Sequence, residues 1–555
     1  MSKQQLIYLP LGGAGEIGMN CYVYGYGPAG KERYIIVDIG VTFPDMDGSP
    51  GVDLIFADID WIAQRRDRLD AIFITHAHED HVGAIGLLWS RLRVPVYCRA
   101  FTASHAKRKM EEQGQDPEQV KIVSAWPEMT TAGPFKVGFL PISHSIPESS
   151  ALVIDSAEGR VIHTGDFKLD KTPLVGEPYD PELWAEVAKD GVKALVCDST
   201  NVFSGHPGRS EASLGDNITK LIAAQSGMVV ATTFASNVAR VRTLAVAGEK
   251  AGRSVCLLGR AMQRMIKASV ETGVLSDFPN TIPVEEARDL PRDSLLLIVT
   301  GSQGERRAAS AQLARGKYLG MSMKEGDTFL MSSKIIPGNE RGVYRIINAY
   351  SEMGVDVVDD NDGMYHVSGH ANRPDLLEMQ NLVKPQMVIP MHGEHRHLRE
   401  HCKMTNEQGR ISVLAPNGTC VSLSGNEPKV VEYVETGRTY LDGTVQIGAL
   451  DGVVRDRIRM ALNGHAIVTL IMDENDEPLG DPWVETMGLP ETGRSGASVI
   501  DVLEADLAQL IGRTADKVLV DDAKLDDALR RAVRNTCNTE LGRKPEVTVV
   551  VSRLS

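Results

Sequence analysis

The 555-residue chain lacks long apolar runs, paired cysteines and a signal-peptide pattern. No apolar stretch reaches the ~20 residues that a helix needs to cross a bilayer, so we expect no membrane partner. The first residues run into a β-rich stretch without a charged and apolar leader, so we expect no secretory signal. The seven cysteines are scattered without a Cys-x-x-Cys pair. This spacing excludes a thiolate zinc site and favours a reducing, cytoplasmic location.

The chain also lacks net positive charge, with 59 Lys and Arg against 74 Asp and Glu and a net charge of −15. Because nucleic-acid phosphates are normally bound by Lys and Arg, this sign is unusual for a nucleic-acid protein. Residues 201–370 are nearly neutral, with 19 basic and 18 acidic residues, so a polyanion would dock best there. Bound divalent cations would add positive charge. An ordinary acidic enzyme with a neutral insertion fits the charge equally well.

Residues 76–81 read His-Ala-His-Glu-Asp-His, directly after the apolar run 71–74. Imidazole nitrogens and carboxylate oxygens bind zinc at about 2.0–2.2 Å. In an extended segment His76 and His78 point the same way, so they can share one ion. Asp80 and His81 come later, at the start of a predicted helix over 82–89, and can face a second ion. A lone histidine would more often be a core residue, but this cluster reverses those odds.

Further donors follow three other predicted strands: His144, Asp166 and His392 each come where an apolar run ends. Open α/β sheets place their ligands at such an edge. His163 is a strand neighbour of this set and is predicted to point away, so we expect no ligand there.

The chain pattern predicts an α/β fold, because β-rich runs alternate with helical patterns over the first ~200 residues. Four apolar runs farther along, each followed by a turn and a helical stretch, predict a second, parallel sheet. They are residues 228–233, 254–258, 294–300 and 328–332. A last segment of β-rich runs and helical stretches predicts a small α+β module for assembly.

This order of motifs resembles the metallo-β-lactamase fold. The resemblance implies that one metal is held by His76, His78 and His144, that the other is held by Asp80, His81 and His392, and that Asp166 bridges them. Asp38 matches an aspartate that orients the ligand loop without binding metal. Because His392 lies far along the chain, the metal domain must be interrupted. We predict a metal domain over 1–205 and 371–450, an inserted α/β domain over 206–370 and a C-terminal α+β domain over 451–555.

Three further segments resemble the β-CASP nucleases and, more narrowly, the bacterial ribonuclease J family: 195–201, 366–371 and 392–394 match its motifs A, B and C. A histidine at motif C accompanies RNA-processing members, whereas DNA-processing members tend to have valine. The segments 233–237, 300–305 and 332–340 also look typical of the family. The expected fold is therefore a metallo-β-lactamase αββα sandwich with an inserted β-CASP domain.

The resemblance assigns Asp198, His370 and Asp80 to catalysis. Asp198 would donate a proton or orient a metal-binding histidine, and His370 would contact phosphate and take part in proton transfer; the residues alone do not decide between these roles. The turn at 368–370 combines a hydroxyl, a glycine N–H and an imidazole, which suits a phosphate. A similar cradle at a helix N-terminus is predicted at Ser302, where a plain β–α turn is the alternative. The predicted substrate-binding residues are His366, Val367, Ser368, Gly369, His370, Ser236, Asn237 and Ser302.

The resemblance implies a metal-dependent ribonuclease that acts in RNA maturation and mRNA decay. It would be a 5′-to-3′ exonuclease that prefers 5′-monophosphate ends and also an endonuclease on single strands. The cofactors would be two divalent ions per chain, Zn²⁺ or Mn²⁺, since nitrogen and oxygen ligands fit both. Phe43 or Phe234 would stack a base, and hinges are expected near 205 and 370.

The expected partners are single-stranded RNA, further copies in a homodimer or homotetramer, and components of RNA-degradation complexes. Two other functions remain open. A lactonase- or thioesterase-like hydrolase would explain the ligands but not the insertion. A non-catalytic RNA-binding subunit would have lost ligands, and this chain has all seven.

Overall fold

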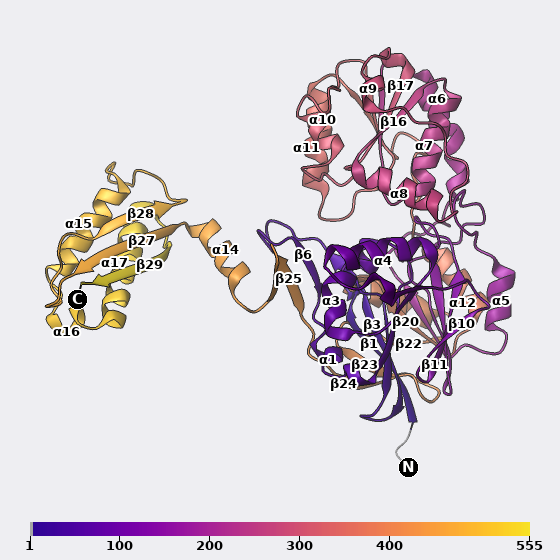
Figure 1. The fold of residues 1–555 in the computed structure, drawn as a ribbon, viewed down its shortest axis with the longest axis horizontal. Coiled ribbons are helices and arrows are strands. Elements are labelled where there is room, and N and C mark those ends of the chain that lie inside the picture. Colours follow the sequence, from indigo (N-terminus) through magenta and orange to yellow (C-terminus); the bar gives the residue numbers. More distant parts are fainter. Residues whose placement is uncertain (1–3, 555) are drawn as a thin grey trace. The chain divides into compact units, whose positions relative to one another are not determined.

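A computed structural model describes residues 4–554, which form two compact units (Figure 1). The first unit comprises the chain up to Thr42 together with Phe56–Arg438, and the second comprises Phe43–Ile55 together with the chain from Thr439 onward. Among the described residues, no helix combines the length and apolar character that a membrane crossing requires.

The first unit contains a metal domain built on two facing sheets. The first sheet has the order β24-β23-β1-β3-β4-β7-β8-β9. Its strands are β24 (Lys429–Tyr433), β23 (Thr419–Ser422), β1 (Gln4–Gly12), β3 (Cys21–Pro28), β4 (Arg33–Val37), β7 (Leu69–Phe73), β8 (Val96–Cys98) and β9 (Val120–Ile122). The second has the order β10-β11-β12-β13-β14-β20-β22. Its strands are β10 (Met129–Ala132), β11 (Phe135–Pro141), β12 (Ser150–Ser156), β13 (Gly159–His163), β14 (Ala194–Asp198), β20 (Met387–Met391) and β22 (Ile411–Ser412).

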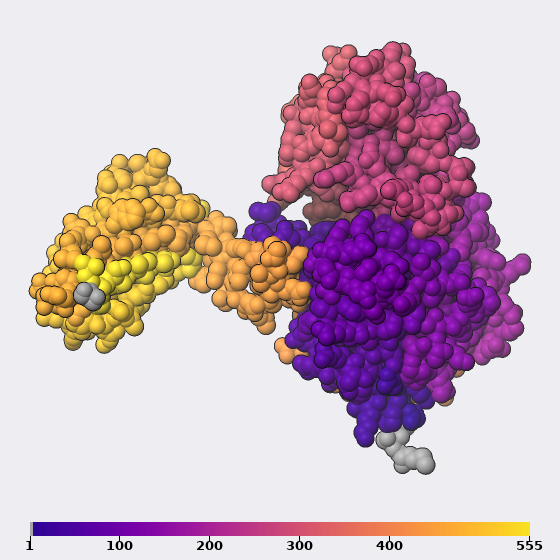
Figure 2. Space-filling view, viewed as in Figure 1, coloured from indigo at the N-terminus to yellow at the C-terminus, as the bar shows by residue number. Residues whose placement is uncertain are grey.

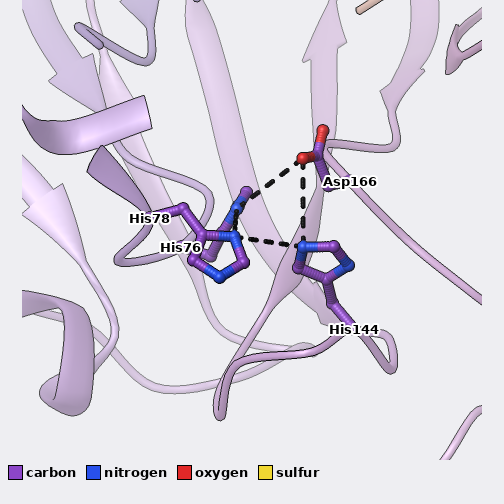
Figure 3. A group of neighbouring side chains, drawn as sticks. All are labelled: His76, His78, His144 and Asp166. Carbon is purple, nitrogen blue, oxygen red and sulfur yellow. Dashed lines mark hydrogen bonds and ion pairs between the residues drawn. The ribbon is translucent and has the colours of Figure 1, made fainter. Parts of the chain in front are cut away.

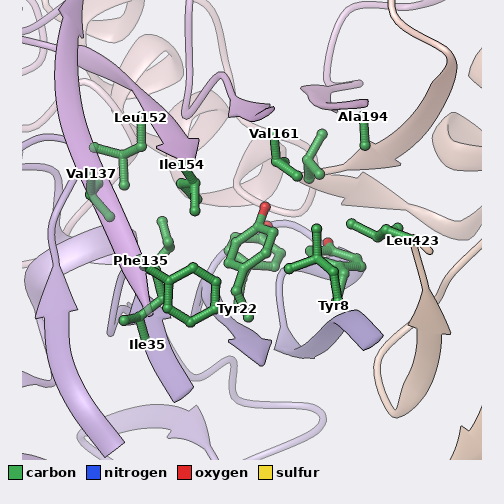
Figure 4. Close-up of a cluster of buried hydrophobic side chains, with 14 of the residues drawn as sticks. Tyr8, Tyr22, Ile35, Phe135, Val137, Leu152, Ile154, Val161, Ala194 and Leu423 are labelled. Carbon is green, nitrogen blue, oxygen red and sulfur yellow. The ribbon is translucent and has the colours of Figure 1, made fainter. Parts of the chain in front are cut away.

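An apolar core fills the space between these sheets (Figure 4). Tyr8 and Tyr22 from the first sheet pack in one cluster with Leu152 and Ile154 from the second. The alternate residues of β12, such as Val153, face the opposite way into a separate cluster under helices. Because successive side chains of a strand point to opposite faces, a strand covered on both sides is apolar throughout.

Helices cover the outer faces of the two sheets, which completes the predicted αββα sandwich. The first sheet carries α1 (Asp60–Ala63), α3 (Ile85–Leu92) and α4 (Ala100–Glu112), and the second carries α5 (Pro181–Ala188), α12 (Arg373–Val383) and α13 (His395–Glu407). The short strands β2 (Ala14–Gly15) and β21 (Gly393–Glu394) pair with each other, and two further short strands are β5 (Val41–Thr42) and β6 (Leu54–Ala57). A proline at the first turn and an Asp180 cap start α5, and a capping box at Asn372 starts α12.

The insertion lies between β14 and β20 and has a sheet of its own, in which all strands are parallel. The order is β16 (Ser254–Leu258), β17 (Leu295–Val299), β15 (Val229–Thr232), β18 (Thr328–Met331) and β19 (Asp356–Val358). One face packs on α6 (Gly215–Ala224), α7 (Val238–Lys250) and α8 (Arg260–Glu271), and the other on α9 (Val284–Ala287), α10 (Ala309–Ala314) and α11 (Glu340–Glu352). The four predicted buried strands of this sheet are confirmed. In space-filling view the magenta insertion and the purple metal domain are two lobes with a hollow between them (Figure 2).

The second unit consists of a hairpin, a helix and a small α+β module. Its elements are β25 (Arg438–Asp442), β26 (Val445–Gly448), α14 (Val453–Asn463), β27 (His465–Met472), β28 (Trp483–Met487), α15 (Val499–Ile511), α16 (Asp516–Leu519), α17 (Asp522–Leu541) and β29 (Glu546–Arg553). The sheet order is β28-β27-β29, and Leu503 and Leu529 from the helices pack on its inner face. The unit includes 439–450, so the domain boundary that we predicted at 450 lies inside it.

Candidate metal centre

The potential metal ligands come from segments that follow the ends of strands in both sheets. The loop 76–81 follows β7, His144 follows β11, Asp166 follows β13 and His392 follows β20. β13, β14 and β20 are parallel neighbours, so their carboxyl ends meet at one edge of the sheet. The fold thus brings His392 to residues more than two hundred positions earlier in the chain.

One group of donors consists of His76, His78, His144 and Asp166 (Figure 3). His78 Nδ1 lies 3.0 Å from His76 Nε2 and 3.1 Å from His144 Nε2. Two ligands held at about 2.0–2.1 Å from one tetrahedral ion lie about 3.3–3.5 Å apart. These nitrogens are therefore close to the spacing that one shared ion requires.

A second group consists of Asp80, His81, His392 and the same Asp166. Asp80 Oδ2 lies 3.5 Å from His81 Nε2 and 3.8 Å from His392 Nε2. Asp166 Oδ2 lies 3.2 Å and 3.3 Å from the same two nitrogens, and 4.0 Å and 3.9 Å from those of His76 and His144. One carboxylate oxygen thus lies among four imidazoles, and the other, Oδ1, is buried without a hydrogen-bond partner. This donor set fits a pair of divalent ions with Asp166 between them.

Hydrogen bonds on the far side of the rings hold the histidines in position. His81 Nδ1 donates to Asp38 Oδ2 at 2.7 Å, and His76 Nδ1 donates to the Thr75 hydroxyl at 3.0 Å. His392 Nδ1 donates to Asn20 Oδ1 at 2.8 Å. Such bonds fix the tautomer, so each ring presents Nε2 to the metal. Asp38 also accepts from the backbone and hydroxyl of Thr75, which anchors the start of the ligand loop.

The ligand loop packs closely against the chain at two glycines, where any side chain would clash with a carbonyl oxygen of the loop. The helix that we predicted over 82–89 is in fact two helices, α2 (Glu79–Val82) and α3. They are separated at Gly83, where a Cβ would lie 2.3 Å from the Glu79 carbonyl oxygen. At Gly40 a Cβ would lie 1.6 Å from the Asp80 carbonyl oxygen. The short helix α2 brings Asp80 and His81 to Asp166 and His392, the other two members of the second group.

Electrostatics within the cluster prepare it for cations. Burial and the neighbouring histidines lower the pKa of His76 and His144 well below the ordinary value. Burial also lowers the pKa of His81, but the nearby Asp166, Asp80 and Asp38 outweigh it and hold that pKa well above the ordinary value. Burial opposes ionisation of Asp166, but His392 and His81 hold its pKa well below the usual range. A cation that binds through His81 would have to displace this proton, so its affinity would fall as the pH is lowered.

The half-buried His370 and the buried Asp198 form a pair beside both groups, and with Asp166 they make a third group of possible donors. His370 Nδ1 donates to Asp198 Oδ2 at 2.7 Å, and Thr200 donates to the other Asp198 oxygen from its backbone and its hydroxyl. The His370 ring stacks on that of His392 at 5.7 Å. Burial lowers the pKa of His370, but the Asp198 charge and hydrogen bond outweigh it and raise this pKa to about 9. Of the two roles predicted for Asp198, the observed bond fits orientation, directed at His370 rather than at a ligand of the two metal groups.

The predicted substrate turn lies directly beside the metal centre. Gly369 O accepts from His144 Nδ1 at 2.6 Å, and Ser368 Oγ accepts from Asn201 Nδ2 at 2.8 Å. His366, Val367 and Ser368 line a cavity of about 430 Å³ between the insertion and the metal domain. Its walls also carry basic and acidic groups: Lys168, Arg209, Lys334, Asp170, Asp360 and Glu340.

The structure shows the surroundings of Ser302 and Asn237, and their binding of substrate stays a prediction. Ser302 is buried, and the helix that follows it in the chain, α10, begins only at Ala309. The side chain of the neighbouring Gln303 donates to Lys334 O and accepts from Ile336 N. The Asn237 side chain caps α7 by accepting from Arg240 N at 3.0 Å, which leaves that oxygen unavailable to substrate.

Among the remaining predicted residues, Ser236 and Phe234 are half-buried at the start of α7, and Phe43, in the second unit, is 64% exposed. His163 belongs to none of the three groups of possible donors found among the described residues. Its Nδ1 lies 2.9 Å from the Tyr24 hydroxyl. This orientation agrees with the prediction that a strand neighbour of the ligand set points away.

Sequence reasoning missed Asn20 and Thr75. Asn20 is fully buried, accepts from His392 Nδ1 and the Tyr22 hydroxyl, and donates to Asp80 O at 2.9 Å. No local pattern marks this residue as part of the centre, because its partners there, Asp80 and His392, lie 60 and 372 positions away.

Replacement of Asn20 by alanine is expected to weaken metal binding by about 10- to 100-fold, because His392 loses the acceptor that orients its ring. Metal retained after dialysis against graded chelator measures this effect. Asn417→Ala is the control, since the Asn417 side chain accepts from Ala14 N and donates to Glu16, neither of which belongs to a donor group. Equal metal loss in the two variants would refute the role of Asn20.

Comparison with protein families matches four successive parts of the chain. Residues 14–206 match the metallo-beta-lactamase superfamily, 226–350 the ribonuclease J beta-CASP domain, 355–416 the Zn-dependent metallo-hydrolase RNA specificity domain and 452–554 the ribonuclease J C-terminal domain. The predicted fold class, a metallo-β-lactamase sandwich with an inserted β-CASP domain and a C-terminal α+β domain, is confirmed.

Curated relatives match over almost the whole chain. Ribonuclease J of Sinorhizobium meliloti is 40% identical over 99% of this chain and 98% of its own length. Ribonuclease J of Mycolicibacterium smegmatis is 35% identical over 98% of this chain and 96% of its own length. A crystal structure of a protein of unknown function from Enterococcus faecalis V583 superposes with a TM-score of 0.52 and 16% identity, covering 75% of this chain and all of that one. This last likeness concerns the fold alone.

Proposed function

Because the chain belongs to the ribonuclease J family and is a metal-dependent hydrolytic ribonuclease, we propose that it degrades RNA from the 5′ end with a preference for 5′-monophosphate. The same site would cut single-stranded RNA internally. We propose roles in RNA maturation and mRNA decay. The observation that supports a phosphodiester substrate most directly is the contact of Gly369 O with His144, which sets the 366–370 turn against the metal centre.

We propose that the two groups of donors hold two ions, Zn²⁺ or Mn²⁺, with His76, His78 and His144 on one, Asp80, His81 and His392 on the other, and Asp166 on both. When bound, such ions polarise a phosphate and make water a nucleophile at neutral pH. Asp38 orients His81 and does not bind metal.

His370 supplies the proton in this scheme. Asp198 holds its Nδ1–H, so Nε2 faces the centre and can protonate the leaving 3′ oxygen as the P–O bond breaks. The raised pKa keeps His370 protonated at neutral pH. Ser368, its neighbouring backbone and the adjoining cavity would hold the other phosphates of the strand.

Digestion of one labelled RNA with 5′-monophosphate, 5′-triphosphate or 5′-hydroxyl ends tests the proposal. We expect release of mononucleotides from the 5′ end, about tenfold faster with the monophosphate, the value of one charge-assisted hydrogen bond. Chelator should stop the reaction, and Mn²⁺ or Zn²⁺ should restore it. Thioester and lactone substrates are the controls. Equal rates on the three ends would refute the 5′-monophosphate preference.

We also propose a cytoplasmic homodimer or homotetramer that works with RNA-degradation partners. All seven cysteines are free. The outer face of the β28-β27-β29 sheet exposes Ile471, Trp483 and Met487, which is an unusual concentration of large apolar side chains for a free surface.

A further inference from the structure

Arg240 on α7 is fully buried, although arginine rarely is. Its guanidinium forms a bidentate pair with Glu211, at 2.6 Å from Nε and 2.9 Å from Nη2. Nη1 donates to the Ser332 carbonyl at 2.8 Å and to His366 Nδ1 at 3.1 Å. Nη2 also reaches the Val367 carbonyl at 3.4 Å. All five N–H donors of this side chain therefore have acceptors.

These acceptors lie on three segments that the sequence separates widely. Glu211 begins the 3₁₀ turn Glu211–Ser213, where the chain enters the insertion. Ser332 follows the end of β18. His366 and Val367 lie where the chain leaves the insertion. One buried cation thus joins the entry segment, the exit segment and the sheet of the inserted domain.

The exit segment is also the substrate turn. The Ser332 hydroxyl accepts from Arg240 and donates to Tyr365 O at 2.6 Å. Burial and the adjacent Arg240 guanidinium lower the pKa of His366 well below the ordinary value, so its ring is neutral and accepts at Nδ1. Arg240 therefore holds the turn at residues 365–367 from the side of the insertion.

The other half of the turn is held from the metal domain. Asn201 donates to Ser368 Oγ, and His144 donates to Gly369 O. His370 follows directly and pairs with Asp198. The turn is therefore fixed at both ends, by Arg240 in the insertion and by the metal domain at its catalytic end.

We propose that Arg240 is a positioning residue for RNA cleavage, which sets the 366–370 turn, and through it His370, against the metal centre. The proposal rests on the proposed role of this turn in holding RNA. Desolvation of a buried ion pair consumes most of its Coulomb attraction, so the pair adds little to stability. The bidentate geometry instead gives directional contacts that a lysine cannot reproduce.

The test compares Arg240→Lys with the wild-type holoenzyme. Lysine keeps the charge beside Glu211 but cannot reach Glu211, Ser332 and the turn together. We expect kcat/KM for RNA to fall about tenfold, with part of the loss in kcat. Hydrolysis of bis(p-nitrophenyl) phosphate should keep the wild-type rate, because nitrophenolate leaves without a proton and needs only the metal centre. Ser332→Ala, which removes one link to the turn, should show the same pattern more weakly.

Arg253→Lys is the matched control. Arg253 is also buried in the insertion, but it donates to Gly227 O and Leu295 O, at the opposite end of the sheet from Ser332. The Arg253→Lys variant should have a changed melting temperature, but its kcat and KM for RNA should equal those of the wild type. Equal effects of Arg240→Lys and Arg253→Lys on RNA, or parallel losses on RNA and on bis(p-nitrophenyl) phosphate, would overturn the proposal. The ratio of the variant's rate to the wild-type rate does not depend on which 5′ end the RNA carries. Equal rates on the three 5′ ends would therefore contradict the proposed function and not the role of Arg240.

Discussion

Replacement of Asp166 by asparagine is expected to lower the rate of RNA cleavage by at least about 10³-fold, the value of roughly 4 kcal/mol of lost transition-state stabilisation. Asp166 Oδ2 is the atom common to both donor groups, within 3.3 Å of His81 and His392 Nε2. Asparagine keeps the volume but removes the negative charge among four imidazoles. Single-turnover cleavage of labelled RNA and the metal content of the purified protein measure the outcome.

The control for this variant is Asp60→Asn, since Asp60 is exposed and pairs with Arg91 at the surface. That variant should keep both metal and activity. RNA cleavage by Asp166→Asn within tenfold of the wild type would show that the carboxylate does not organise the reaction centre. It would favour the view that the cluster has only a structural role.

Replacement of His370 by alanine is expected to reduce kcat by about 10²- to 10⁴-fold, the usual contribution of a general acid. Metal content should stay near the wild-type level, because the variant keeps every member of the two groups of four donors, whereas His370 belongs to a smaller group with Asp166 and Asp198. In this variant the fall of the rate at high pH, the alkaline limb of the pH–rate profile, should also disappear. His370 is protonated below its pKa of about 9, so in the wild type the rate falls as the pH rises through that value, or through a lower one when bound cations repel the proton.

Asp198→Asn separates this role from a purely structural one. Removing the carboxylate charge lowers the pKa of His370, so the alkaline limb should move to lower pH rather than disappear. His395→Ala is the control, since His395 is exposed on α13. A pH–rate profile that is the same in wild type, His370→Ala and Asp198→Asn would exclude His370 as the proton donor.

Much of the centre could be predicted from residue types and their order along the chain. Histidine and aspartate following apolar runs indicate metal ligands, because the carboxyl ends of parallel strands meet at one edge. The same logic indicated the insertion, since His392 can reach the 76–81 loop only if the intervening chain folds separately. The parallel strands of the insertion were visible because strands buried on both faces are apolar throughout.

Side chains that act through distant partners could not be predicted in this way. Asn20 and Arg240 look like ordinary polar residues in the sequence, and their roles come from contacts that span up to 372 positions. The Gly-Ser context of Ser302 suggests a phosphate cradle, and only the tertiary structure shows that this residue is buried and lies several residues before α10.

By itself the sequence determined the chemistry of this protein: which donors it has, that they are nitrogen and oxygen, and that they follow strand ends in a layered α/β fold. Those properties are local, since they depend on side-chain type and on periodicity along a few residues. Only the tertiary structure decided which oxygen lies among the imidazoles, which ring nitrogen each histidine presents, and what holds the substrate turn. Those properties depend on hydrogen bonds between segments that meet only when the chain has folded.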